Sequence, residues 1–490
     1  MKKLLLTILL LCSCNSGNLS KQSINFESSN STSSHTTNFM SSSTSSSTTS
    51  TTSTSTSTSS STSSSKEPEF KNVTIRIGLD SDRLVSFLQQ KFISKKINGI
   101  KLEFYNESPT FAASKIEEHK DIMPDIQSVM YNDVENYIDS FAEYDENISL
   151  KLQNNSIEKY YNFSKPVFVP YFYHGYSFAY NRAMLSEFGL DMNNLNENGI
   201  PVEIDTFEEI FALSSKYYNE GYKTYNGLEI TKFLNIVTNN LYFSYPFLTT
   251  GGWKMFSNPE DSLDIGINSN EFKEGLNFYA AAADAKVNVE KLGNDYLLTD
   301  PNSLNGYNYH DFYNDRFPMS LVPSYEYYDG QNIDDYMFSP LPTWKGNQPS
   351  LLIKVDGFVI NKYSKNIDAA KYVLNYLYSD EFLSILTESN FHSPLVLCDD
   401  YAFNINLSNF KNSQSLSYKY SQYEQFPKLP NIPNKKISDV YYGIGIEHKL
   451  TQIWLEASTH INDRDSWISE IHQTIINDYN NKFVELDALN

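Results

Sequence analysis

Four residues that could bind a polar ligand follow two of the strands expected near the start of the folded part. Asp80 follows an alternating apolar strand, and Tyr131, Asn132 and Asp133 follow a later one. Ligands of a parallel α/β sheet bind beyond the carboxyl ends of its strands. Carboxylate, amide and phenol groups form hydrogen bonds with polar ligands. These four residues therefore predict a ligand-binding edge of the sheet.

Signals for catalysis are weak. The run 175–179 (GYSFA) is one glycine short of a nucleophile elbow. Glu117, Glu118 and His119 are adjacent and would point in different directions on a helix, which favours a solvated face over a metal site. The run 443–445 (GIG) lacks the further glycine and the preceding strand of a phosphate-binding loop. We therefore expect a protein without catalytic residues, cofactor or metal.

The first 14 residues, MKKLLLTILLLCSC, have the features of an export signal. Two lysines precede an apolar run that is too short to span a bilayer as a helix. The run ends in Leu11-Cys12-Ser13-Cys14, which resembles the bacterial lipobox, where a cysteine is acylated and becomes the new N-terminus. We expect lipidation at Cys14 and a multiply acylated anchor in the membrane. An ordinary cleaved signal with an incidental cysteine is the alternative.

Residues 15–66 are expected to form a disordered tether. Positions 41–65 are serine or threonine without exception, and such a composition cannot bury enough apolar surface to fold. A flexible coil of this length would hold the folded part on the order of 40 Å from the lipid. A spacer is the simpler interpretation, and an adhesive or glycosylated stalk is the alternative.

Charge and cysteine content limit the partners and the sources of stability. The chain has 38 basic and 59 acidic residues and a net charge of -21, which argues against nucleic acid and anionic lipid headgroups as partners. It has three cysteines. After cleavage and acylation at Cys14 only Cys398 would remain, so no intramolecular disulfide is expected.

The folded part begins near Phe70 with a strand, helix, strand, helix, strand pattern. Apolar residues alternate over 73–77 and 100–105, as in half-buried strands, and recur at helical spacing over 84–92. A further strand is expected over 124–129. This order predicts a parallel α/β sheet.

Seven segments carry a resemblance to a known family. They are 124–133 (PDIQSVMYND), 170–185 (PYFYHGYSFAYNRAML), 240–256 (NLYFSYPFLTTGGWKMF), 312–325 (FYNDRFPMSLVPSY), 338–344 (FSPLPTW), 355–361 (VDGFVIN) and 369–394 (AAKYVLNYLYSDEFLSILTESNFHSP). In this order they resemble the extracellular solute-binding proteins of carbohydrate ABC importers, of the maltose-binding type. A helix with a capping box, Thr206 and Glu209, falls between the second and third segments.

The resemblance implies the two-lobed periplasmic-binding-protein type II fold, an α/β fold with discontinuous lobes and a central ligand cleft. One lobe would contain residues 67–175 and 355–405, and the other would contain residues 176–354 and 406–490. Closure of such lobes about a hinge is a known response to ligand.

The resemblance also implies which residues contact the ligand. A sugar needs flat aromatic surfaces for its apolar faces and polar groups for its hydroxyls. The implied aromatic contacts are Tyr242, Phe243, Tyr245, Trp253, Tyr325, Tyr441 and Tyr442. The implied polar contacts are Asp80, Asn132, Asp133 and His174. Two departures leave the sugar open, because the maltose-binding pattern has acidic residues where this chain has His174 and Asn132. For each aromatic residue, packing in the core is the alternative.

These observations favour a monomeric, lipid-anchored substrate-binding subunit of an ABC importer, on the extracellular face of the cell membrane. It would bind a neutral sugar or oligosaccharide, because the candidate site has no cluster of lysines and arginines that could bind a phosphate or carboxylate. It would deliver this ligand to permease subunits. A surface adhesin or antigen that keeps the fold is the alternative. A hydrolase is the least favoured hypothesis, because no pair of carboxylates can be singled out as acid and nucleophile.

Overall fold

The structure is a computed structural model. It describes residues 70–80, 82–153, 163–197, 200–255, 264–299, 309–323, 335–379, 381–382, 385, 396–397 and 435–488. The predicted lipidation site Cys14, the tether 15–66, Tyr325 and Cys398 lie outside these residues.

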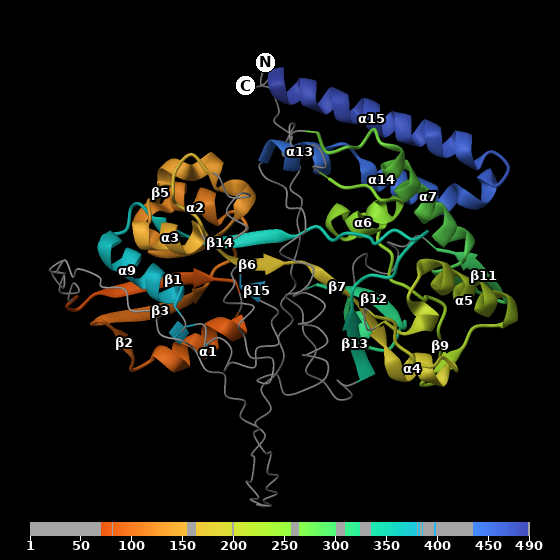
Figure 1. Cartoon of the computed structure of the whole chain (residues 1–490), viewed down its shortest axis with the longest axis horizontal. Helices are drawn as coiled ribbons and strands as arrows, with labels where there is room; N and C mark the ends of the chain where they lie inside the picture. Colours follow the sequence, from red (N-terminus) through yellow and green to blue (C-terminus); the bar gives the residue numbers. More distant parts are fainter. Residues whose placement is uncertain are drawn as a thin grey trace, which may run out of the picture. The chain divides into compact units, whose positions relative to one another are not determined.

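A large mixed sheet contains the strands predicted near the start of the chain (Figure 1). Its order is β15 (Val396–Leu397), β6 (Val169–His174), β14 (Lys354–Asn361), β4 (Ile126–Met130), β1 (Thr74–Leu79), β3 (Ile100–Asn106) and β2 (Lys96–Ile97), with β5 (Phe141–Ala142) paired to β14. β1 pairs in parallel with β3 and β4, as predicted. β14 runs antiparallel to both β4 and β6, so the sheet continues with strands from distant parts of the sequence.

Helices pack on both faces of this sheet. They are α1 (Asp82–Phe92), α2 (Ala112–His119), α3 (Glu146–Gln153), α9 (Ile367–Leu377) and the short 3-10 helices η1 (Lys120–Ile122), η2 (Tyr131–Asp133) and η3 (Glu135–Ser140). α1 and α9 share one apolar cluster with Ile77 and Ile126, whereas α2 packs in a second cluster with Val129. Because strand residues of opposite parity point to opposite faces, Ile126 and Val129 show that β4 is covered on both sides.

A second sheet has three antiparallel strands in the order β12 (Met319–Pro323), β7 (Tyr176–Asn181) and β13 (Tyr336–Ser339). Two hairpins accompany it, β8 (Thr224–Tyr225) with β9 (Leu228–Glu229) and β10 (Val289–Leu292) with β11 (Asp295–Leu298). Only Gly175 separates β6 of the large sheet from β7. The chain returns from β13 to β14 through 340–353. The lobe boundaries expected from the sequence stay a prediction.

The remaining helices all follow β7 in the chain. They are α4 (Arg182–Glu187), η5 (Val202–Ile204), α5 (Phe207–Glu220), α6 (Leu241–Leu248), η6 (Thr249–Gly251), α7 (Asn270–Asp284), α8 (Tyr309–Tyr313), α13 (Lys435–Gly443), α14 (Ile446–Glu456), η10 (Ala457–His460) and α15 (Arg464–Ala488). The predicted capping box begins α5, where Thr206 Oγ1 accepts from Glu209 N at 3.2 Å and Glu209 Oε2 accepts from Thr206 N at 3.3 Å. That prediction is confirmed.

α7 lies against the end of α6 because two glycines let their backbones approach. A Cβ on Gly275 would lie 2.0 Å from the Leu248 carbonyl oxygen, and one on Gly251 would lie 2.3 Å from the Glu271 carbonyl oxygen. A side chain at either position would therefore push the two segments apart. The close packing fixes α6, which carries three of the predicted aromatic contacts.

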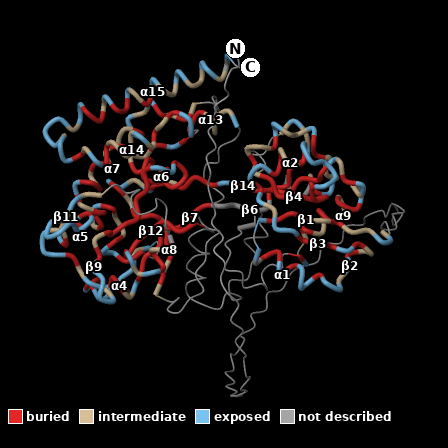
Figure 2. Tube along the Cα trace, turned by 180° about the vertical axis from the view of Figure 1, so that it is seen from behind, coloured by how far each residue is buried: buried red, intermediate tan, exposed pale blue. Residues whose placement is uncertain are grey.

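The core is rich in aromatic rings. Phe207, Phe278 and Phe247 form neighbouring pairs, with ring centroids 4.9 Å apart for Phe207 and Phe278 and 5.4 Å apart for Phe247 and Phe278. Figure 2 shows buried residues along the strands and the inward sides of the helices. Many of the tyrosine and phenylalanine side chains therefore pack in the core. None of the helices in the described residues is long and apolar enough to cross a membrane.

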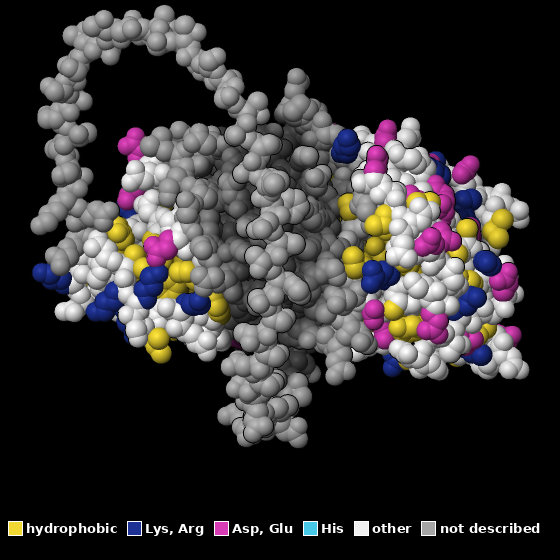
Figure 3. Space-filling view, turned by 60° about the horizontal axis from the view of Figure 1, so that its bottom comes forward, with side chains coloured by type: hydrophobic (Ala, Val, Ile, Leu, Met, Phe, Trp, Pro, Cys, Tyr) yellow, Lys and Arg dark blue, Asp and Glu magenta, His cyan; other side chains and the backbone are white. Residues whose placement is uncertain are grey.

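The surface carries mixed charge. On the face in Figure 3, Lys and Arg side chains lie among Asp and Glu side chains, with small apolar areas between them. The protein as a whole is acidic, with a net charge of -21.

Candidate ligand-binding site

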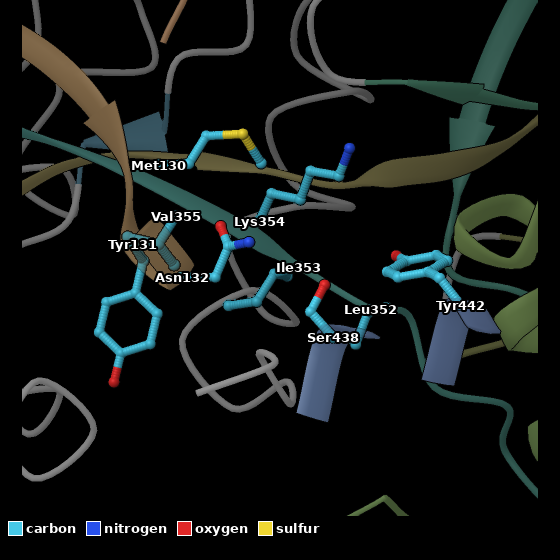
Figure 4. Close-up of a pocket in the computed structure, with 9 residues that line it drawn as sticks. All are labelled: Met130, Tyr131, Asn132, Leu352, Ile353, Lys354, Val355, Ser438 and Tyr442. Atoms are coloured by element: carbon cyan, nitrogen blue, oxygen red, sulfur yellow. The ribbon is translucent and has the colours of Figure 1, made fainter. Parts of the chain in front are cut away.

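A pocket of about 120 Å³ lies where three segments of the chain meet (Figure 4). These segments are the end of β4 with η2, the residues that lead into β14, and α13. The lining residues are Met130, Tyr131, Asn132, Leu352, Ile353, Lys354, Val355, Ser438 and Tyr442. The predicted ligand-binding edge of the sheet therefore forms one wall of this pocket.

Strand pairing and helix spacing explain how these residues meet. Met130 ends β4 and pairs with Asp356 of β14, so the last residues of β4 lie beside the first residues of β14. Lys354 is the first residue of β14 and pairs with His174 of β6. Ser438 and Tyr442 are four residues apart on α13, and such residues share one face of a helix. η2 and α13 lie next to each other, which closes the pocket.

Three predicted site residues line the pocket: Tyr131, Asn132 and Tyr442. Tyr442 is 39% exposed and lines the pocket, while burial around its hydroxyl raises the pKa of Tyr442. Tyr131 is buried, with its ring 5.0 Å from Phe163 and 5.9 Å from Phe168 between centroids, and in Figure 4 the ring points away from the other labelled side chains. Burial raises the pKa of Tyr131 to about 12, so its hydroxyl stays protonated at neutral pH.

The lining of the pocket does not include the other predicted polar contacts, Asp80, Asp133 and His174. Asp133 is half-buried. Burial raises its pKa, as do the nearby Asp439 and Asp356, whereas Lys435 of α13 acts in the opposite direction. Asp80 is exposed at the end of β1. Among the residues that the structure describes, no three His, Cys, Asp or Glu side chains are grouped so that they could hold a metal ion.

Five of the predicted aromatic contacts lie in the core: Tyr242, Phe243, Tyr245, Trp253 and Tyr441. Trp253 Nε1 donates to the Ile265 carbonyl oxygen at 2.8 Å. The hydroxyl of Tyr441 donates to the Leu241 carbonyl oxygen at 3.2 Å. In this structure these rings pack against protein, and their contact with a ligand stays a prediction.

Sequence reasoning did not select Met130, Ser438, or the lining residues of 352–355. Lys354 directly precedes the segment VDGFVIN, and a lysine at that place is more simply explained as the solvated start of a strand. Ser438 lies one helical turn before Tyr442. That spacing could have identified Ser438 once Tyr442 was placed on a helix.

Comparison with known families identifies the class of protein. The family model described as bacterial extracellular solute-binding protein matches residues 98–382. The matched range is more than half of the chain and contains β4, η2 and the start of β14, which form much of the pocket wall. No curated protein matches the chain. The chain therefore belongs to the bacterial extracellular solute-binding proteins, the substrate-binding components of ABC transporters.

Proposed function

We propose that this protein is the lipid-anchored substrate-binding subunit of an ABC importer, which binds a carbohydrate reversibly and delivers it to membrane permease subunits. The observation that carries the proposal is the pocket itself. In a chain of a solute-binding family, η2 beside the large sheet, the start of β14 and α13 converge on one concave site. Binding there needs no chemical step.

The side chains of the pocket suit a carbohydrate. Tyr442 offers an accessible aromatic ring for an apolar sugar face. The Asn132 amide, the Ser438 hydroxyl and the Lys354 ammonium offer donors and acceptors for the rim of hydroxyls. Met130 adds a flexible apolar surface that adapts to irregular shapes. Few polar groups among apolar ones are typical of small-molecule sites.

The anchor proposal depends on Cys14. Acylation there would hold the protein at the extracellular face of the cell membrane, near its permease, as a monomer on a serine- and threonine-rich tether. Replacing the acceptor in Cys14→Ala should release the protein from the membrane fraction. Mass spectrometry of the N-terminal peptide should find the lipid in the parent chain. Retention of Cys14→Ala in the membrane would contradict lipid anchoring at this residue.

A thermal-shift screen of the full chain against mono- and oligosaccharides tests the binding proposal. A ligand that binds only the folded state raises the melting temperature, with about 2.7 kcal/mol of added stability at a hundredfold excess over Kd. Tyr442→Ala and Asn132→Ala should abolish the shift. Tyr105→Ala is the control, because Tyr105 is 43% exposed on β3 and is absent from the pocket lining. If folded, ligand-free protein responds to no sugar, the carbohydrate proposal fails and the adhesin alternative gains support.

A further inference from the structure

The pocket has an apolar wall formed by Leu352, Ile353 and Val355. These three residues are 1%, 4% and 2% exposed, and their side chains have no hydrogen-bonding group. Met130 adds a partly buried thioether to the lining. The volume of about 120 Å³ is smaller than the roughly 300–1,000 Å³ of pockets that enclose drug-sized ligands. The pocket therefore suits one substituent or one edge of a sugar, and that part of the sugar must be apolar where it meets the wall.

Two neutral polar side chains line the same pocket, Asn132 of η2 and Ser438 of α13. Both are half-buried, and neither side chain has a hydrogen-bond partner within the part of the chain that the structure describes. In the view of Figure 4, the Ile353 side chain lies between the Asn132 amide and the Ser438 hydroxyl. Lys354 also lines the pocket, but its Nζ already interacts with protein, 4.6 Å from the Tyr242 ring centroid. A ligand in this pocket therefore meets an amide, a hydroxyl and an apolar surface.

A sugar that carries only hydroxyl groups matches this lining poorly. Such a sugar has a hydroxyl on most of its carbons, and a hydroxyl that is buried against apolar side chains without a partner costs free energy. An acetamido substituent matches the lining better, because it ends in a methyl group and also has one N–H donor and one carbonyl acceptor. The Asn132 amide can donate to that carbonyl and accept from that N–H, and the Ser438 hydroxyl can do either. Every polar atom of the substituent then has a partner.

We infer that the pocket selects a sugar with an acetamido substituent, such as an N-acetylhexosamine or an oligosaccharide of it. The methyl group packs on the apolar wall, and the amide bonds to Asn132 and Ser438. The Tyr442 ring lines the same pocket and remains for an apolar face of the sugar ring. This inference rests on the proposed function of the same pocket. It narrows the neutral sugar expected from the sequence to one chemical class.

Matched ligand pairs test this inference. Calorimetric titration of the full chain at pH 7 would compare N-acetylglucosamine with glucose, N-acetylgalactosamine with galactose, and di-N-acetylchitobiose with cellobiose. We expect the acetamido sugar of at least one pair to bind about 10- to 100-fold more tightly, the effect of one buried methyl group and one or two hydrogen bonds. Glucosamine has the nitrogen without the acetyl group and should bind no more tightly than glucose.

Variants of the pocket test the roles of its residues. Asn132→Leu keeps a side chain of similar size without hydrogen-bonding groups and should remove most of the preference. Ile353→Thr places a hydroxyl in the apolar wall and should also weaken the preference. Asn277→Leu is the matched control, because Asn277 is half-buried on α7, donates to Glu274 Oε1 at 3.0 Å and is absent from the pocket lining. The melting temperature without ligand shows whether each variant folds.

The outcomes separate the inference from the proposed function. Equal binding of acetamido and hydroxyl sugars, or a folded Asn132→Leu variant that keeps the preference, overturns the inference and leaves the proposed function intact. An equal preference for 6-deoxygalactose over galactose would assign the selectivity to a methyl group alone, and it would also overturn the inference. Failure of every sugar to bind refutes the proposed function itself.

Discussion

Lys232 should destabilise the folded protein at neutral pH. Its side chain is 4% exposed, and its Nζ lies 5.0 Å from the centroid of the Phe317 ring. Burial lowers the pKa of Lys232 from 10.5 to about 8, and Asp311 offsets only part of this effect. Lys232→Met keeps an unbranched apolar stem of similar length and removes the charge. We expect this variant to have the larger free energy of unfolding.

The pKa gives the magnitude and the sign. The folded pKa of about 8 is lower than 10.5 by about 2.5, which at about 1.4 kcal/mol per pH unit corresponds to roughly 3 kcal/mol. Between pH 8 and 10.5 the unfolded state holds more protons than the folded state, so stability rises with pH in that window. Below pH 8 the full penalty is present. The advantage of Lys232→Met should therefore be greatest at pH 7 and should disappear by pH 10.5.

Urea unfolding at pH 7, 9 and 10 measures this difference. Lys216→Met is the control, because Lys216 is exposed and its Nζ lies 5.9 Å from the Tyr217 ring centroid. Its free energy of unfolding should change by less than about 0.5 kcal/mol. A loss of stability in Lys232→Met at pH 7, or a gain that does not shrink as pH rises, would refute the reasoning.

Three further changes probe stability. Thr206→Ala removes the cap of α5 and should lower the free energy of unfolding by about 1 kcal/mol. Gly275→Ala places a Cβ 2.0 Å from the Leu248 carbonyl oxygen and should cost roughly 3 kcal/mol, because backbone must move. His472 is buried with Nε2 2.8 Å from the Ile267 carbonyl oxygen, and burial lowers its pKa below 6.5. Stability should therefore fall as pH drops below 6.5, and by less in His472→Gln. Urea unfolding at pH 7.5 and pH 5 measures all three.

Matched controls separate these effects from general damage. Thr206→Ser keeps the capping oxygen and should retain most of the stability. A Cβ on Gly443 would meet only the flexible end of Lys482, at 3.2 Å, so Gly443→Ala should be tolerated. If Gly275→Ala were as stable as Gly443→Ala, the close approach of α7 to α6 would not be rigid. If the free energy of unfolding of His472→Gln fell with pH as much as that of the parent chain, His472 would not be the cause of the fall.

The sequence predicted the elements whose signals are local. Alternation over 73–77 and 100–105 corresponds to β1 and β3, and helical spacing over 84–92 corresponds to α1. The parallel pairing of β1 with β3 and β4 could also be predicted, because helices connect these strands and parallel strands need such crossover connections. The partners of β14 could not be predicted in the same way, because β4 and β6 lie far away in sequence. Only the resemblance to a family placed 355–361 in the same lobe as residues 67–175.

The candidate site was harder to predict because adjacent residues can have opposite environments. Tyr441 and Tyr442, both implied as ligand contacts by the resemblance, are neighbours inside α13. Consecutive helical residues point about 100° apart, so Tyr441 faces the core while Tyr442 faces the pocket. Composition cannot distinguish two neighbouring tyrosines. The position of Lys354 depends on the register between β14 and β6, which no local pattern in the sequence encodes.

Tyr242 lies in the core of the structure, where it is 4% exposed. The family resemblance implies that its ring stacks on a sugar, whereas in the structure the ring lies under Lys354 Nζ. A double-mutant cycle separates these roles, because residues that act through one another are not additive. If Tyr242 acts only by packing under Lys354, Tyr242→Leu should cost no further affinity for a sugar that binds the parent chain once Lys354→Met is present. If the ring stacks on the sugar, the two losses should add. Additive losses in this cycle would return Tyr242 to the role implied by the resemblance.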